Sequence, residues 1–179
     1  MKPSNVLLLP GWEGSGPQHW QSLWEQGHGY RRVEQHDWTH PLRGDWIARL
    51  EDVVLSCDEQ PVLVAHSLGC ILAAAWASVS RNSQRVKGAL LVAPGDTERE
   101  DLRTALRSWS PIPLDALPFP TVLVASRDDP FCSFERARLF AQAWGSRFID
   151  HGPSGHINAD SGLGSWPEGH ILLQDLLRD

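Results

Sequence analysis

The 179-residue sequence has few cysteines, no long apolar run and no excess of positive charge. Its three cysteines, Cys57, Cys70 and Cys132, are widely spaced, which argues against a disulfide framework or a CxxC metal site and predicts a reduced, cytoplasmic protein. The apolar stretches are too short to cross a bilayer, and no signal peptide is expected before the first of them. With 16 basic and 22 acidic side chains, the formal charge of −6 would repel a nucleic acid. We therefore expect neither a membrane nor a nucleic acid as partner.

What the sequence does contain is a regular alternation of short apolar runs and longer amphipathic ones. Four runs are continuous, apolar and rich in β-branched side chains, as in strands buried on both faces of a parallel sheet: residues 5–9, 61–65, 89–93 and 121–125. Two runs are more polar, as expected of strands near the edges: residues 31–36 and 147–150. Helical spacing of apolar residues fills the intervals, over residues 46–54, 67–79, 98–107, 134–144 and 170–177.

This alternation predicts one domain over residues 1–179, an α/β fold of the three-layer α/β/α sandwich type. The sheet is expected to be mostly parallel, with about six strands and right-handed crossovers. The connection that contains residues 98–107 has room for a helix and a loop but not for a cap domain. Ligands of such sheets bind beyond the carboxyl ends of the strands, where all the motifs below fall.

The second buried run leads into His66-Ser67-Leu68-Gly69 and then into a helix. Strand, tight turn and helix are the context of a nucleophile elbow, which holds serine in a strained conformation at a helix N-terminus. Residues two positions from that serine must be small: Gly69 fits, and Ala65 replaces the more usual glycine. A serine that only caps an ordinary helix would give the same local pattern. Ser67 is therefore a candidate nucleophile whose assignment depends on partners elsewhere.

An elbow serine is followed along the chain first by an acid and then by a histidine. Asp128 and Asp129 both follow the fourth buried run; we prefer Asp129, because Pro130 biases it toward an extended conformation and turns Asp128 toward solvent. His156 lies in a glycine-rich loop after the last strand, and His151, nearer to the strand end, is the alternative base. The other histidines show no metal-ligand spacing, so we expect no metal and no cofactor.

The oxyanion of a tetrahedral intermediate needs preorganised N–H donors. One is expected to be the backbone N–H of Leu68, the residue after the serine, and the other that of Trp12 in the glycine-rich loop at residues 10–16. This loop matches neither GxGxxG nor GxxxxGK[ST], which argues against phosphate binding.

Nine tryptophans stand beside a single tyrosine. Most are expected to pack in the core, but four lie in segments that read as loops or helix starts, where large aromatic side chains often line a pocket. The predicted pocket residues are Trp12, Trp20, Trp109 and Trp166.

Several motifs follow one another in a fixed order over nearly the whole chain: Leu9-Pro10-Gly11-Trp12, Gly16-Pro17-Gln18-His19-Trp20, His66-Ser67-Leu68-Gly69, Ser126-Arg127-Asp128-Asp129-Pro130-Phe131, Gly155-His156-Ile157-Asn158-Ala159-Asp160-Ser161-Gly162 and Trp166-Pro167-Glu168-Gly169. Together they resemble the retinoblastoma-binding-protein-9/YdeN family of small serine hydrolases, and the last resembles its bacterial branch. The resemblance implies a compact α/β-hydrolase fold with a triad of Ser67, Asp129 and His156, and it supports Asp129 over Asp128.

The resemblance also directs attention to Leu55-Ser56-Cys57-Asp58-Glu59, which matches the L-x-C-x-E pattern for binding pocket proteins. Because Leu55 and Cys57 end an amphipathic helix and the acidic residues form the turn after it, we expect a helix end here and not a partner site. Short motifs of this kind match often by chance.

Two functions remain open at this point. The first is a carboxylesterase-like serine hydrolase that acts on small or medium acyl esters, with thioesters or amides as further substrates. The second is a binding or regulatory protein that keeps the fold with little turnover, since a fold does not by itself establish activity. The expected partner is a small acyl substrate, and the expected assembly is a monomer or weak homodimer.

Overall fold

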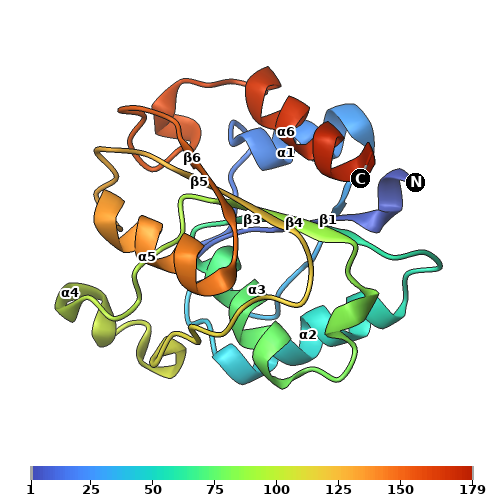
Figure 1. The fold of residues 1–179 in the computed structure, drawn as a ribbon, viewed down its shortest axis with the longest axis horizontal. Helices are drawn as coiled ribbons and strands as arrows, with labels where there is room; N and C mark the ends of the chain where they lie inside the picture. Colours follow the sequence, from blue (N-terminus) through green and yellow to red (C-terminus); the bar gives the residue numbers. More distant parts are fainter. Residues whose placement is uncertain (1, 179) are drawn as a thin grey trace.

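Six parallel strands form one sheet in the computed structural model, which describes residues 2–178 (Figure 1). The strands are β1 Val6–Leu9, β2 Arg31–Arg32, β3 Val62–His66, β4 Gly88–Val92, β5 Thr121–Ala125 and β6 Arg147–Asp150. Their order is β2-β1-β3-β4-β5-β6, and every neighbouring pair is parallel. The four central strands are wholly buried, whereas the two edge strands are partly exposed, as their polar sequences predict.

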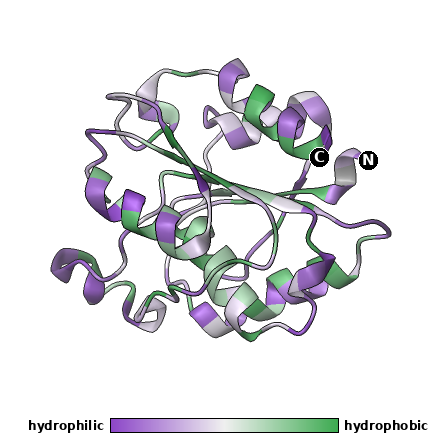
Figure 2. Cartoon of the chain, viewed as in Figure 1, coloured by the Kyte–Doolittle hydropathy of each residue, from purple (hydrophilic) through white to green (hydrophobic). Residues whose placement is uncertain are grey.

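Helices cover both faces of this sheet. They are α1 Trp20–His28, α2 Arg43–Leu55, α3 Leu68–Val79, α4 Glu100–Arg103, α5 Phe134–Trp144 and α6 Pro167–Arg178. Figure 1 shows α1 and α6 on one face, and α2, α3 and α5 on the other. Alternate residues of β1 belong to the two cores: Leu7 and Leu9 pack with α2, α3 and α5, and Val6 and Leu8 with α1 and α6. In Figure 2 the hydrophobic colouring follows the strands that lie between the two layers. The predicted three-layer α/β fold is therefore confirmed.

The edge strand β2 is shorter than predicted, with two residues in place of the run over 31–36. The Val33 N–H still donates to the Leu8 carbonyl at 2.9 Å, but β1 ends at Leu9. Since β1 is the only neighbour of β2, the later residues of the run have no strand to pair with.

The predicted helix over 98–107 is also wrong in extent: only α4 and a 3₁₀ turn, η3 Arg107–Trp109, form there. The chain turns inward after α4 because Trp109 is fully buried and its indole N–H donates to the Pro41 carbonyl at 2.9 Å. The connection between β4 and β5 thus contains two short helical turns, and no cap domain stands over the sheet edge. The last helix begins three residues earlier than predicted, with Pro167 in its first position, where a missing N–H costs nothing.

Among the helices of residues 2–178, none combines the length and the apolar character that crossing a bilayer requires.

Helix α3 lies tightly against the end of β1 at Gly69, in the first turn of the helix. A Cβ atom on Gly69 would lie 2.1 Å from the Leu9 carbonyl oxygen, which belongs to the backbone and cannot rotate away. The glycine therefore lets α3 start directly against the end of β1.

We expect Gly69→Ala to lower the free energy of unfolding by about 3 kcal/mol, the upper end of the usual range for overpacked positions. Gly44→Ala in α2 is the matched control, because no atom lies within 4 Å of the added methyl group. Urea unfolding followed by circular dichroism measures both. A Gly69→Ala protein as stable as the wild type would contradict this account of the turn.

Candidate active site

Ser67 forms the turn between β3 and α3, with φ 53° and ψ −120°. Such a backbone conformation costs a non-glycine residue about 1–3 kcal/mol and persists only where the surroundings impose it. Here the Ser67 N–H donates to the Val92 carbonyl and its own carbonyl accepts from the Cys70 N–H, both at 3.0 Å. Gly11 and Gly95 lie close to the Ser67 side chain. A Cβ atom added to Gly11 would lie 2.8 Å from Ser67 Cβ, and one added to Gly95 would lie 3.3 Å from Ser67 Oγ. The turn is thus held from two neighbouring loops.

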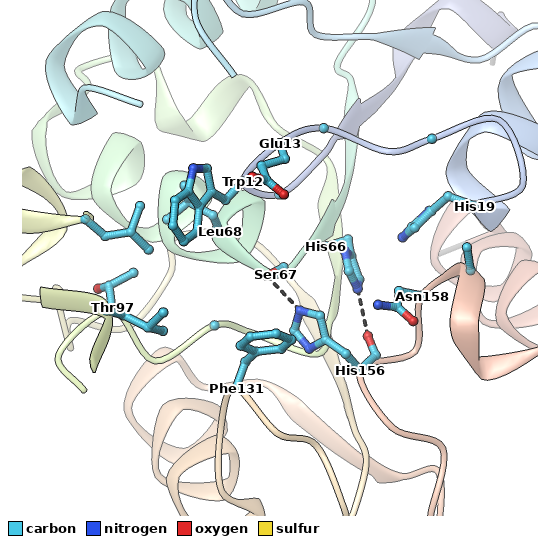
Figure 3. A pocket seen from close by; sticks show the side chains of 17 residues that line it. Trp12, Glu13, His19, His66, Ser67, Leu68, Thr97, Phe131, His156 and Asn158 are labelled. Atoms are coloured by element: carbon cyan, nitrogen blue, oxygen red, sulfur yellow. Dashed lines mark hydrogen bonds between the residues drawn. The ribbon is translucent and has the colours of Figure 1, made fainter. Parts of the chain in front are cut away.

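A chain of hydrogen bonds runs from Ser67 to a buried carboxylate (Figure 3). Ser67 Oγ lies 2.8 Å from His156 Nε2, and His156 Nδ1 lies 2.9 Å from both carboxylate oxygens of Asp129. Because the carboxylate can only accept, Nδ1 carries the proton and Nε2 accepts from the serine hydroxyl. The Asp129 side chain is 3% exposed, so water screens this interaction little. The structure therefore brings the three predicted triad residues together.

Asp128, the alternative acid, is exposed but does not simply face solvent as predicted. Its Oδ1 accepts from the Ser126 hydroxyl at 2.7 Å and from the Gly155 N–H at 2.8 Å. The Ser126 hydroxyl in turn accepts from the Ser154 N–H at 2.9 Å. Asp128 and Ser126 thus tie the loop after β5 to the loop that carries His156. The pKa of the Asp128 carboxyl is held below its ordinary value, chiefly by the hydrogen bond from the Ser126 hydroxyl, because such bonds favour the charged form.

The alternative base, His151, is engaged away from the serine. Its Nδ1 donates to the Ser154 hydroxyl at 2.7 Å, and its Nε2 accepts from the Trp166 indole at 3.1 Å. His66 also has a structural contact, because its Nε2–H donates to the His156 carbonyl at 2.8 Å. Burial lowers the pKa of His66 well below its ordinary value, so the ring is neutral and carries its proton on Nε2. Among the histidines, all of which lie in the described part of the chain, only His156 forms a hydrogen bond with Ser67 Oγ.

The two predicted oxyanion donors border the same cavity as Ser67. Leu68 is the first residue of α3, where helical N–H groups lack partners, and the Trp12 loop is held in place by an indole N–H that donates to the Thr39 carbonyl at 3.0 Å. Within residues 2–178 no hydrogen bond uses the backbone N–H of Leu68 or of Trp12. Both are therefore available to a bound group.

A cavity of about 430 Å³ opens above Ser67. Trp12, Leu102, Leu106 and Phe131 form apolar parts of its lining, and His19, His66 and Asn158 form polar parts. Of the residues that line the cavity, sequence reasoning identified Trp12, Ser67, Leu68 and His156 as site residues. Two features of the sequence could have indicated further lining residues. Leu102 and Leu106 are four residues apart, as on one face of a helix, and Phe131 directly follows the acidic turn.

Three of the four predicted pocket tryptophans do not line this cavity, and that prediction is corrected. Trp20, Trp109 and Trp166 are buried in the core, each at most 1% exposed. Their indole N–H groups bond to neighbours inside the fold; Trp20, for example, donates to the Ile157 carbonyl at 2.8 Å. A large apolar ring with one satisfied donor is stable in a core, so position near a loop does not make a tryptophan a pocket residue.

The segment that matches the L-x-C-x-E pattern is a helix end, as expected. Leu55 is the last residue of α2, and the buried Cys57 thiol donates to the Val53 carbonyl. The cysteine is therefore not presented on the surface of the fold.

The family profile described as serine hydrolase matches residues 6–175. The chain belongs to this serine hydrolase family. With the fold and the Pectobacterium atrosepticum structure described below, it is a small YdeN-like member of the α/β-hydrolase superfamily. A comparison with curated proteins gives no match.

Solved structures show the same relationship. A YdeN-like hydrolase of Pectobacterium atrosepticum is 32% identical over 96% of this chain and 89% of its own, with a TM-score of 0.83. The ydeN gene product of B. subtilis is 20% identical over 97% of this chain and 98% of its own, with a TM-score of 0.78. A thermophilic esterase of Thermogutta terrifontis is 16% identical over 97% and 89%, with a TM-score of 0.67. The last two support the fold alone.

We expect Asp128→Ala to release the loop that carries His156, because two hydrogen-bond donors lose their acceptor. The Gly155 amide proton should then exchange with solvent faster, which nuclear magnetic resonance measures at a single residue. Asp128→Asn, which keeps Oδ1, is the matched control and should exchange like the wild type. Equal exchange in all three proteins would show that Asp128 does not hold the loop.

Proposed function

We propose that this serine hydrolase is a carboxylic-ester hydrolase that cleaves small or medium acyl esters through an acyl-enzyme, with thioesters and amides as chemically related substrates. One observation carries the proposal: Ser67, His156 and Asp129 form a continuous hydrogen-bonded chain, whose serine and histidine line the cavity. In this reading the turn at Ser67 is a nucleophile elbow.

In the proposed mechanism the Ser67 hydroxyl loses its proton to His156 Nε2 as Oγ attacks the acyl carbonyl. The resulting oxyanion accepts hydrogen bonds from the backbone N–H groups of Leu68 and Trp12, each worth about 3–4 kcal/mol in comparable sites. His156 then gives its proton to the leaving alcohol as the bond between acyl carbon and alcohol oxygen breaks. A water molecule, deprotonated in the same way, attacks the acyl group and releases the carboxylic acid and the free serine.

Asp129 keeps the imidazole in the tautomer that this sequence needs. While His156 carries the extra proton, the carboxylate 2.9 Å from Nδ1 stabilises the imidazolium. The free N–H groups and the dipole at the start of α3 favour negative charge at the same place.

The size and lining of the cavity support the proposed substrate class. A volume of about 430 Å³ suits a small ligand, since pockets for such ligands span about 300–1,000 Å³. Leu102, Leu106 and Phe131 offer an apolar wall for an alkyl chain. A non-catalytic binding protein would be favoured by a serine and histidine held apart, and the 2.8 Å separation argues for the enzyme instead.

The proposed location is the cytoplasm. All three cysteines are free, whereas disulfides are typical of proteins in oxidising compartments.

Ser67→Ala tests the nucleophile. We expect a fluorophosphonate probe to label the wild type but not the variant, and kcat for p-nitrophenyl butyrate to fall by about 10⁶-fold, as in other triads without their serine. Ser165→Ala, at an exposed serine, is the matched control and should be labelled like the wild type. Equal labelling of Ser67→Ala and wild type would refute the assignment.

Asp129→Asn tests the choice between the adjacent carboxylates. The amide can present the wrong partner to His156 Nδ1, and we expect kcat to fall by about 10⁴-fold. Asp128→Asn removes the same charge one residue away and should stay within about threefold of the wild type, because its acceptor oxygen remains. Steady-state kinetics on p-nitrophenyl butyrate compare the two. Similar losses in both variants would count against Asp129 as the sole orienting acid.

A further inference from the structure

The cavity has a polar side that the proposed triad does not use. Figure 3 shows Trp12, Leu68 and Thr97 on one side of Ser67, and His19 on the other side together with Asn158. His19 belongs to the motif at residues 16–20, which no step of the mechanism explains.

The protonation state of His19 follows from its position at the start of α1. Its Nδ1 accepts from the Gln21 N–H at 3.1 Å, as the helix N-cap. Burial lowers the pKa of His19 to about 3, so the ring is neutral near pH 7. A neutral imidazole that accepts at Nδ1 carries its proton on Nε2. His19 is therefore a fixed hydrogen-bond donor at Nε2.

This donor is buried and has no acceptor within residues 2–178. The nearest aromatic neighbours are the rings of His66 and Trp20, with centroids 4.6 and 5.2 Å away. His66 donates its own Nε2–H to the His156 carbonyl and so is committed elsewhere. Leaving a buried donor unpaired costs about 1–3 kcal/mol, so such groups normally have partners.

Asn158 adds a second donor to the same side. Its Oδ1 accepts from the Asp160 N–H at 3.1 Å, as the cap of the 3₁₀ turn η4 Ala159–Ser161. The amide nitrogen Nδ2 is then left as a donor, and no hydrogen bond within residues 2–178 uses it. Two residues that line the cavity thus each hold a neutral donor without an acceptor in the described chain.

We propose that His19 and Asn158 form a polar subsite that binds an uncharged oxygen acceptor of the substrate, such as an ether or carbonyl oxygen. The inference rests on the proposed ester hydrolysis and adds a substrate class to it: esters with an alkyl part for the apolar side and a second oxygen for the polar side. An anionic group is disfavoured, because the Glu13 side chain lines the same cavity. A substrate that lacks the oxygen leaves the donors unpaired, which is how polar sites discriminate.

Two pairs of esters that differ only by oxygen in place of a methylene group test the subsite. In the acyl part the pair is p-nitrophenyl methoxyacetate and p-nitrophenyl butyrate; in the alcohol part it is 2-methoxyethyl butyrate and butyl butyrate. The measured quantity is the ratio of kcat/KM for the ether ester to that for its alkyl partner. Comparing this ratio between wild type and variant cancels the intrinsic reactivity of each ester.

His19→Asn keeps a side-chain acceptor to cap α1 and removes the Nε2 donor. Asn158→Ser likewise keeps a side-chain acceptor to cap η4 and removes the Nδ2 donor. We expect each to lower the ether-to-alkyl ratio about tenfold in one of the two pairs, since tenfold corresponds to about 1.4 kcal/mol, within the range for one unpaired donor. His36→Asn changes an exposed histidine and is the control, with the wild-type ratio expected. If His19→Asn does not fold, Asn158→Ser decides the question alone.

Wild-type ratios in both variants and both pairs, with the alkyl esters still hydrolysed, would overturn the subsite and leave the proposed function standing. His19 Nε2–H would then be satisfied by a weak contact with the His66 ring. A wild-type protein that hydrolyses none of the four esters would instead refute the proposed function, and the subsite with it.

Discussion

The backbone conformation of Ser67 is the constraint on which the site depends. A positive φ at the end of β3 lifts Oγ above the carboxyl edge of the sheet and starts α3 at once, so that the serine lies beside free helical N–H groups. The fold allows this only because three glycines keep side-chain carbon away from the turn: Gly69 against β1, and Gly11 and Gly95 against the serine itself. The same glycines bring the Trp12 and Gly95 loops to the cavity. The strained backbone at Ser67 therefore determines how closely the loops that carry Gly11 and Gly95 approach the serine.

Buried hydrogen-bond donors help to position the loop that carries His156. Trp20 and His66 donate to the carbonyls of Ile157 and His156, and Asp128 accepts from Gly155 on the other side. Trp20, His66 and Asp128 belong to motifs that mark the family resemblance, yet within residues 2–178 none of the three forms a hydrogen bond with Ser67 Oγ. These contacts hold a glycine-rich loop that has little rigidity of its own.

Without a cap domain, the discrimination among substrates must come from the lining of the cavity itself. The apolar side can select by size, which yields modest factors, because one methylene group is worth only about 1–3 kcal/mol. A polar side discriminates more strongly when its donors are buried and otherwise unpaired. His19 meets both conditions, since its Nδ1 is committed to the α1 cap and its Nε2 is buried with no acceptor in the described chain.

The alternation of strands and most helices could be predicted from the sequence, and Ser67, Asp129 and His156 could be chosen as candidates, because both depend on periodicity and on the order of motifs along the chain. Helix α1 was not predicted. The edge strand β2 and the helix near residue 100 were predicted too long, since their ends depend on where β1 stops and where Trp109 is buried. Only the tertiary structure decided which tryptophans face the cavity. It alone also showed that Asp128 holds the loop that carries His156. Local pattern determines what a segment forms, whereas the direction and partners of a side chain depend on which distant segments meet it.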